Sequence, residues 1–527
     1  MFNLTVPNTL DRKAHGSLQS KLREKLSEAI ARGDFEQGQT LPSTRVMAEQ
    51  LKISRNTVTL VYEELAAEGV LISAQRRGFY VAPDAVSRLP QSQQNQSTTA
   101  SVDWDSKLVI NPAAMEHITH PHDWRSKKYT FMYGQHDRWI FPIDNWRKCS
   151  RDSLSLHDMY DWTVDYVDED DPVLLDAFRR RVLPRRGFTA STQEVLVTVG
   201  AQHALYLAIQ CLLRPGMVVG IEDPSYPDVR NLMLFHGAIL VPLPVDHDGV
   251  IISDAMKECD VIYVTPSHQS PTTVTLSHSR RRQLLEMAAE HDFIIIEDDY
   301  DTESRFGRFP SSALKAIDTD GRVVYVTSLS KLLSPGLRVG FLVGPLPFIR
   351  QARALRRMSI RHPAANNQRT VALFLKGGYY ESLLKRFHEE YALRWNTLQQ
   401  ALKQYIPCAE IASSEGGSSV WLKFPEHINT RELSNRAYQR DVYIQPGESY
   451  FLSPPQNPSP EKQLSQQPSL HNPGTRPTHY MRIGFSSIKV EDIADGIAIV
   501  GGVVDEMLAE ITNLHLTPNT KCFLPER

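Results

Sequence analysis

The spacing of apolar positions in residues 17–33 predicts the first helix of a compact N-terminal unit. Leucine or isoleucine recurs every four residues, which places the side chains on one helix face, at Leu18, Leu22, Leu26 and Ile30. Gly33 is a suitable C-terminal stop. We therefore expect an amphipathic helix that buries this face against the segments that follow it.

Two shorter amphipathic helices, separated by a tight turn, are predicted next. Ser43 and Ser54 stand where N-caps are expected. The apolar faces consist of Val46, Met47 and Leu51 in the first helix, and of Val58, Val61, Tyr62 and Leu65 in the second. Two short helices around a tight turn form a helix-turn-helix pattern. Alternating residues on both sides of 75–78 then predict a β-hairpin, which completes a winged helix-turn-helix domain.

Two polar segments divide the rest of the chain. Residues 84–103 and 453–479 are poor in large apolar residues and rich in Gln, Ser, Thr or Pro, a composition typical of linkers and surface insertions. We expect a winged helix-turn-helix DNA-binding domain over 12–83 and a flexible linker over 84–110. A second domain is expected over 111–515, with a low-complexity insertion at 453–479.

The second domain alternates short apolar runs with helical patterns, which predicts an α/β fold with a mainly parallel sheet covered on both faces. In such sheets ligands bind at the carboxyl ends of the strands. Polar clusters follow the predicted strands at 200–202, 222–223, 267–269, 298–300 and 328–331. We expect these clusters to meet at one edge of the sheet.

Composition excludes several classes of protein. A chain of 527 residues is too long for a single core, and its net charge of −3 is close to neutral. No apolar run approaches the length of a membrane span, and the N-terminus lacks the features of an export signal, so we expect a cytoplasmic protein. The five cysteines are odd in number and far apart, which argues against disulfides and against a metal site.

The polar cluster around Lys331 has the groups that an aldehyde cofactor with a basic ring nitrogen requires. The lysine amine would form an imine, Asp298 or Asp299 would hold the ring nitrogen protonated, and Tyr300 would donate to the ring oxygen. Tyr226 is placed to stack on the ring. A phosphate would be held by Ser328, Ser330, Arg338 and the backbone amides of Ala201 and Gln202 at a helix N-terminus.

Residues 197–207, 222–230, 296–306, 328–340 and 481–488 resemble the motifs of fold type I aminotransferases, which have a large and a small lobe. With the helix-turn-helix in front, the chain resembles the MocR-type (GabR-like) transcription regulators. The resemblance implies pyridoxal 5'-phosphate bound as an imine to Lys331, with Asp298 rather than Asp299 on the ring nitrogen. It also implies that Arg482 binds the carboxylate of an amino-acid-like ligand.

Two positions depart from the pattern of the related enzymes. Thr273 replaces a glycine in residues 270–273, and Asp171 stands near the place of another glycine. Neither change touches the imine. We therefore expect them to alter the handling of a substrate rather than the binding of the cofactor, as suits a sensor.

Residues 41–71 resemble a GntR-type winged helix. A recognition helix leads into the major groove with its N-terminal residues, here Ser54, Arg55, Asn56, Thr57 and Thr59. Arg45 would contact the DNA backbone, and Arg76 and Arg77 at the tip of the hairpin would reach the minor groove or phosphates.

The combined interpretation is a homodimeric regulator of promoter DNA that senses a small amine or amino acid. The effector would displace Lys331 and form an external aldimine, and Arg482 would select an acid group. Two alternatives stay open at this point: a working aminotransferase with an attached DNA-binding domain, and a winged-helix protein whose large domain only dimerises. The effector is also open among γ-aminobutyrate-like, taurine-like and ectoine-derived amines and pyridoxal phosphate itself.

Overall fold

The computed structural model contains two compact units, Met1–Ile110 and Asn111–Arg527. It describes residues 17–74, 78–88, 102–135, 137, 139–165, 168–301, 303, 312–329, 331–412, 416–452 and 476–516. Arg76, Arg77, Ser330 and most of the predicted insertion at 453–479 lie outside these ranges. In the described part of the chain, none of the helices combines the length and the apolar character that crossing a membrane requires.

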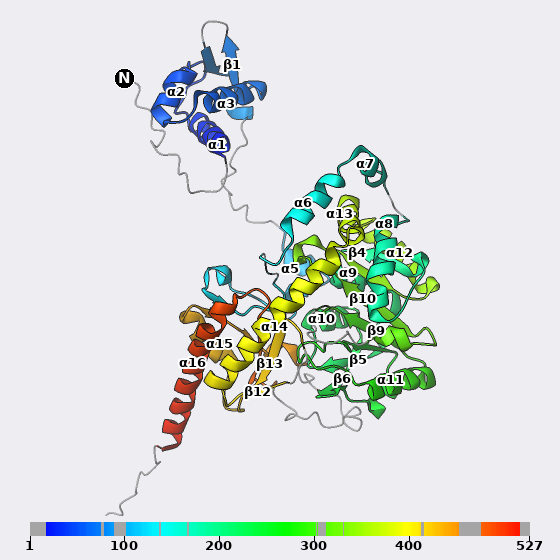
Figure 1. The fold of residues 1–527 in the computed structure, drawn as a ribbon. Coiled ribbons are helices and arrows are strands. Elements are labelled where there is room, and N and C mark those ends of the chain that lie inside the picture. The colour runs from blue at the N-terminus through cyan, green and yellow to red at the C-terminus, as the bar shows by residue number, and fades with distance from the viewer. Residues whose placement is uncertain are drawn as a thin grey trace, which may run out of the picture. The chain divides into compact units, whose positions relative to one another are not determined.

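The first unit is the predicted winged helix-turn-helix (Figure 1). Its elements are α1 (Leu18–Ala31), α2 (Thr44–Leu51), α3 (Arg55–Ala67), the antiparallel pair β1 (Leu71–Ala74) and β2 (Gly78–Val81), α4 (Ala85–Arg88) and α5 (Trp104–Lys107). The side chains of Ser43 and Ser54 cap α2 and α3 as predicted. Leu18 and Val46 differ from the prediction, because they are 37% and 41% exposed at the edge of the small core.

The second unit has a large lobe built on an eight-stranded sheet. The strands lie in the order β4 (Val195–Thr198), β11 (Gly340–Val343), β10 (Val323–Ser328), β9 (Ile294–Asp299), β8 (Val261–Val264), β5 (Val218–Asp223), β6 (Ile239–Asp246) and β7 (Gly249–Val250). Neighbours from β10 to β6 are parallel, whereas β11 and β7 run antiparallel to the strands beside them. The predicted mainly parallel sheet is thus confirmed.

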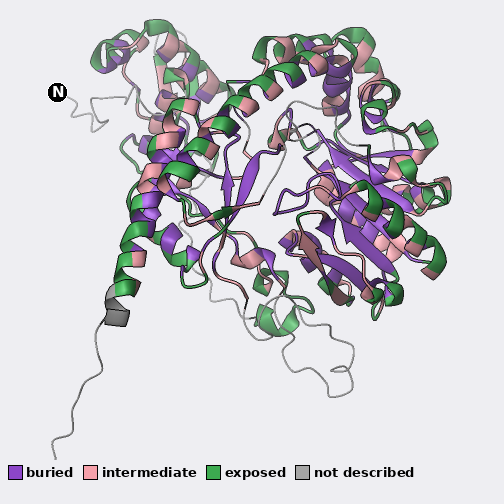
Figure 2. Cartoon of the chain, turned by 60° about the horizontal axis from the view of Figure 1, so that its bottom comes forward, coloured by how far each residue is buried: buried purple, intermediate pink, exposed green. Residues whose placement is uncertain are grey.

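Helices cover both faces of this sheet because its central strands are apolar on both sides (Figure 2). Tyr263 and Ile296 face a cluster with α9 (Gly200–Leu212) and α12 (Leu346–Ile360). Ile262 and Ile295 face the opposite cluster with α11 (His278–His291). The remaining helices of this lobe are α6 (Ile143–Asp152), α7 (Leu156–Trp162), α8 (Pro172–Arg181), α10 (Pro227–Phe235) and α13 (Ala365–Lys376).

The long helix α14 (Tyr379–Tyr405) leads into a small lobe, where it packs beside α16 (Val490–Leu516) (Figure 1). This lobe contains an antiparallel sheet in the order β12 (Glu410–Ile411), β13 (Ser419–Lys423), β16 (Tyr480–Gly484) and β15 (Gln445–Pro446). It also contains α15 (Thr430–Gln439) and the parallel pair β14 (Val442–Tyr443) and β3 (Tyr129–Thr130). Arg482, on β16 of the small lobe, therefore lies in the same compact unit as Lys331 of the large lobe.

Candidate functional site

Lys331 follows the carboxyl end of β10 and is half-buried. Its Nζ lies 4.1 Å from the centroid of the Tyr133 ring. Gly134 leaves room for the amine, because a Cβ at that position would lie 3.0 Å from Nζ. Burial is the largest influence on the amine and lowers the pKa of Lys331 to about 8. A larger share of the amine is therefore neutral near pH 7 than in an exposed lysine, and the neutral form is the nucleophile.

The two aspartates at the end of β9 have different environments. Asp299 accepts hydrogen bonds from Arg186 at 2.7 and 3.2 Å and from the Tyr325 hydroxyl at 2.6 Å. Asp298 accepts one hydrogen bond from the Tyr263 hydroxyl at 2.8 Å, and its Oδ1 has no partner among the described residues. Burial raises the pKa of Asp298 to about 7. Asp298, unlike Asp299, keeps an oxygen open toward a cationic ligand.

Tyr300 and Tyr226 lie on either side of this aspartate in the chain, and both interact electrostatically with it. The hydroxyl of Tyr300 is buried and has no hydrogen-bond partner within the described ranges. Tyr226 directly precedes α10, and its hydroxyl donates to Asp228 at 2.8 Å. This bond fixes the phenol while the ring stays half-buried, as a stacking residue requires.

A site suited to an anion lies between the end of β4 and the start of α9. Arg338 Nη2 donates to the carbonyl oxygen of Val199 at 3.1 Å, next to the first turn of the helix. Gly200 has φ +76° there, and a Cβ at this position would lie 2.6 Å from Arg338 Nη2. The amides of Ala201 and Gln202 belong to this first turn, where backbone N–H groups and the helix dipole favour negative charge. Ser328 is buried at the end of β10.

Arg482 is 1% exposed on β16. Its Nε donates to Ser419 Oγ at 2.9 Å and its Nη1 to the Tyr450 hydroxyl at 3.3 Å, which fixes the guanidinium plane. Its Nη2 has no partner in the described part of the chain. The Arg482 Cζ lies 3.3 Å from the centroid of Tyr133. A buried guanidinium with an open donor is a site for an acidic group.

Sequence reasoning missed Tyr133, whose ring contacts both Lys331 and Arg482. It also missed the hydrogen bonds from Arg186 and Tyr263 that distinguish Asp299 from Asp298. No spacing rule separates Tyr133 from an ordinary core aromatic, since residues 129–135 have neither a clear helical nor a clear alternating pattern.

The two departures from the enzyme pattern differ in their structural setting. Thr273 is buried with φ +67°, a left-handed conformation that favours glycine. Asp171 caps α8 by accepting from the backbone N–H groups of Val173 and Leu174 at 2.8 and 3.0 Å. It also accepts from Arg369 Nε at 2.7 Å. Asp171 thus links the start of α8 to Arg369 on α13 within the large lobe.

The predicted DNA-contacting residues that the structure describes lie on α2 and at the start of α3. Ser54 Oγ accepts from the Thr57 backbone N–H at 3.2 Å, so Ser54 is occupied as the cap of α3. Arg55 and Asn56 are exposed in the first turn, and Thr59 Oγ1 donates to the Arg55 carbonyl oxygen at 3.0 Å. Arg45 is also exposed and forms a 3.4 Å ion pair with an exposed glutamate on α2.

Comparisons with known proteins identify both units. The family model for bacterial regulatory proteins of the gntR family matches residues 18–81, and that for aminotransferase class I and II matches residues 166–457. The HTH-type transcriptional regulator TauR of Rhodobacter capsulatus is 37% identical over 486 residues, which cover 92% of this chain and 96% of TauR. This chain belongs to the MocR-type transcriptional regulators. The protein named "Probable rhizopine catabolism regulatory protein MocR" of Rhizobium meliloti is 31% identical over 85% of this regulator and 90% of its own length.

Solved aminotransferases share the fold of the second unit of this MocR-type regulator. An archaeal alanine:glyoxylate aminotransferase superposes with a TM-score of 0.68 at 23% identity, over 77% of this chain and all of the enzyme. The α-aminoadipate aminotransferase LysN of Thermus thermophilus superposes with a TM-score of 0.66 at 24% identity, over 78% of this chain. The class I and II aminotransferase family depends on pyridoxal phosphate. The amine of Lys331, the open carboxylate oxygen of Asp298 and the anion site beside Arg338 fit that cofactor.

Proposed function

We propose that this MocR-type regulator binds pyridoxal phosphate at Lys331 and uses it to sense a small amine or amino-acid effector. The observation that carries the proposal is a set of buried polar atoms around one amine, none with a partner among the described residues: Asp298 Oδ1, the Tyr300 hydroxyl and Arg482 Nη2. Buried polar groups in folded proteins are normally hydrogen-bonded. A bound ligand would satisfy all three at once.

Each residue has a role in this proposal. When bound, the cofactor supplies an aldehyde carbon to which a primary amine adds reversibly. Lys331 is the residue that would hold this carbon, and an effector amine would compete with it. Asp298 keeps the ring nitrogen protonated, Tyr300 donates to the ring oxygen, and Tyr226 stacks on the ring. The phosphate is held by Arg338, Ser328, Ser330 and the amides of Ala201 and Gln202, and Arg482 binds an acid group of the effector.

The winged helix-turn-helix carries the response to double-stranded promoter DNA. We propose a homodimer, so that two DNA-binding units can engage two half-sites. An effector that prefers one arrangement of the dimer shifts the population toward it and so changes the affinity for DNA. Arg55 and Asn56 read bases from the start of α3, Thr57 and Thr59 support them, and Arg45, Arg76 and Arg77 contact phosphates or the minor groove.

A second candidate function is a catalytically active aminotransferase with an attached DNA-binding domain. The observation in its favour is that Lys331 lies in one unit with Asp298, Tyr300 and Arg482, each of which has an open polar atom. The two functions differ in turnover. A sensor binds the amine and stops, whereas an aminotransferase converts many equivalents of an amino acid and a keto acid.

A spectral titration tests the proposal. The purified full-length protein, loaded with pyridoxal phosphate, is titrated with amines with and without duplex DNA selected from a random library. We expect a visible absorption band, absent in Lys331→Ala and present in the exposed-lysine control Lys403→Ala, that amines change together with the affinity for DNA. A wild-type protein without such a band contradicts the proposal, and sustained formation of a new amino acid supports the aminotransferase instead.

A further inference from the structure

Tyr133 lies against both cationic groups of the site. Its ring centroid is 4.1 Å from Lys331 Nζ and 3.3 Å from Arg482 Cζ. Both distances are measured to the same ring, so the amine and the guanidinium are close neighbours. A ligand that joins them can have only a few carbon atoms between its amine and its acid group.

The backbone of the small lobe holds Tyr133 in this place. The Phe131 N–H donates to the Tyr443 carbonyl oxygen at 2.9 Å, and the Gly484 N–H donates to the Phe131 carbonyl oxygen at 2.9 Å. Gly484 permits the close approach, because a Cβ there would lie 2.5 Å from the backbone nitrogen of Tyr133. Gly484 and Arg482 belong to the same strand, β16. The strand that carries the guanidinium therefore also positions the tyrosine.

The Tyr133 hydroxyl is buried and has no hydrogen-bond partner within the described ranges. Burial raises the pKa of Tyr133 well above its ordinary value, so the phenol is neutral and can donate. The ring stands edge-on to Tyr300, with 6.4 Å between the centroids and an interplanar angle of 85°. Tyr133 thus adds a second open donor to the site that contains the open Nη2 of Arg482.

We propose that Tyr133 determines the specificity of the site for short amino acids. Its hydroxyl donates to the acid group that Arg482 Nη2 binds, and its ring limits the length of the effector. The proposal rests on the proposed function of the site. The specificity proposal goes beyond that function because it predicts which amines the site prefers, whereas the function requires only that the site binds amines.

Matched pairs of amines with and without an acid group test the proposal by visible absorption of the loaded full-length protein. The pairs are β-alanine with propylamine and γ-aminobutyrate with butylamine, and the measured quantity is the ratio of their half-saturating concentrations. In the wild type the acid-bearing amine should act at the lower concentration. Tyr133→Phe should reduce this preference about tenfold, the effect of one hydrogen bond to a charged group. Tyr438→Phe, which removes a phenol that donates to Asp123 on the small lobe, should leave the preference unchanged.

Tyr133→Leu tests the ring separately. It should improve δ-aminovalerate relative to β-alanine, because the smaller side chain leaves room for a longer ligand. If Tyr133→Phe keeps the wild-type preference for both acids, the proposal is wrong and the sensor function stands. If Tyr133→Phe loses the cofactor band itself, Tyr133 retains the cofactor and the specificity role is wrong. If no amine changes the wild-type spectrum, the proposed function fails first.

Discussion

Arg186 and Asp299 form an ion pair, with Nε to Oδ2 at 2.7 Å and Nη2 to Oδ1 at 3.2 Å, in the interior of the large lobe. Both side chains are almost fully buried. The pair uses both oxygens of Asp299, whereas the adjacent Asp298 keeps Oδ1 open. Asp299 therefore has a structural role, whereas Asp298 keeps an oxygen available for a ligand.

Replacement of each aspartate by asparagine should separate these roles. Asp299→Asn leaves Arg186 buried without its counter-charge and should lower the free energy of unfolding of the second unit by about 3 kcal/mol. Asp298→Asn should change stability little, because burial already disfavours its charge, but should weaken the retention of pyridoxal phosphate. Urea unfolding and the visible band after dialysis measure the two effects. The opposite pattern would assign the cofactor contact to Asp299.

The pH dependence of cofactor loading should follow the amine of Lys331. Burial lowers the pKa of Lys331 to about 8, so the neutral amine becomes abundant as the pH rises toward 8. The initial rate of band formation, after pyridoxal phosphate is added to stripped protein, should increase between pH 6 and 9 and level off near pH 8 to 9, as expected for this pKa. A rate that keeps rising toward the ordinary lysine pKa would contradict burial of the amine.

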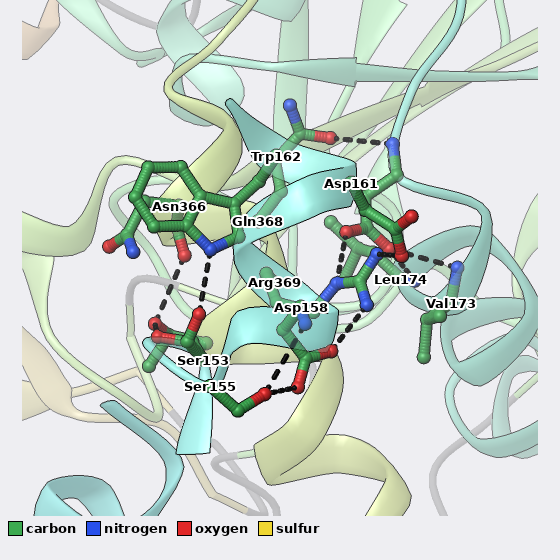
Figure 3. Close-up of polar contacts among 12 residues, drawn as sticks. Ser153, Ser155, Asp158, Asp161, Trp162, Val173, Leu174, Asn366, Gln368 and Arg369 are labelled. Carbon is green, nitrogen blue, oxygen red and sulfur yellow. Dashed lines mark hydrogen bonds and ion pairs between the residues drawn. The ribbon is translucent and has the colours of Figure 1, made fainter. Parts of the chain in front are cut away.

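The Arg369 cluster should stabilise the large lobe (Figure 3). The guanidinium of Arg369 donates to Asp158 at 2.6 Å, Asp161 at 2.9 Å and Asp171 at 2.7 Å, and thereby ties α7 and the start of α8 to α13. Arg369→Met leaves the buried Asp171 uncompensated and should cost about 3 to 5 kcal/mol in urea unfolding. Arg357→Met removes an exposed ion pair with Asp168 and should cost less than about 1 kcal/mol. Equal losses would contradict a role for burial.

The same cluster predicts a loss of stability in acid. Burial acts to raise the pKa of Asp158, but hydrogen bonds from Ser155 and Arg369 outweigh it, and the net pKa is lowered. A lowered pKa in the folded state contributes stability above the unfolded value near 4, and this contribution is lost as the pH falls through the folded value. The difference in unfolding free energy between wild type and Asp158→Asn should therefore shrink below about pH 4. A difference that grows in acid would contradict the direction of the shift.

Thr273→Gly should stabilise the protein. Thr273 has φ +67° and a buried hydroxyl without a partner among the described residues. Glycine adopts this conformation without strain and removes the unsatisfied group, although it increases the entropy of the unfolded chain. We expect a net gain of about 1 kcal/mol, measured by thermal unfolding. A loss of stability would show that the lost packing of the threonine methyl group outweighs the relief of backbone strain and the removal of the unsatisfied hydroxyl.

Arg55 should contribute to DNA binding from the first turn of α3. Arg55→Ala should weaken binding to a duplex selected from a random library by about 1 to 3 kcal/mol in fluorescence anisotropy. Arg32→Ala, which removes an exposed arginine at the end of α1 paired with Asp34, should have little effect. Arg45→Ala should weaken binding to all duplexes similarly and reduce its salt dependence. Equal effects of Arg55 and Arg32 would contradict α3 as the recognition helix.

Local signals predicted the helices, the strands and their caps well. The caps Ser43 and Ser54, the apolar faces of α1 and α3, and the mainly parallel sheet depend on periodicity and short-range hydrogen bonds, which can be read within a few residues. The choice between Asp298 and Asp299 depended on a family resemblance. In the structure Arg186 and Tyr325 donate hydrogen bonds to Asp299, and both are distant from it in the sequence.

The sequence by itself therefore determined the order of the elements, the division into two units and the residue types at the strand ends, because backbone propensity and hydrophobic periodicity act locally. Only the tertiary structure decided which groups share one environment. Tyr133, Lys331 and Arg482 belong to three separate segments, and the backbone contact between Phe131 and Gly484 brings the tyrosine onto β16. Such a contact joins segments of the small lobe that are about 350 residues apart in the sequence, and no local pattern encodes it.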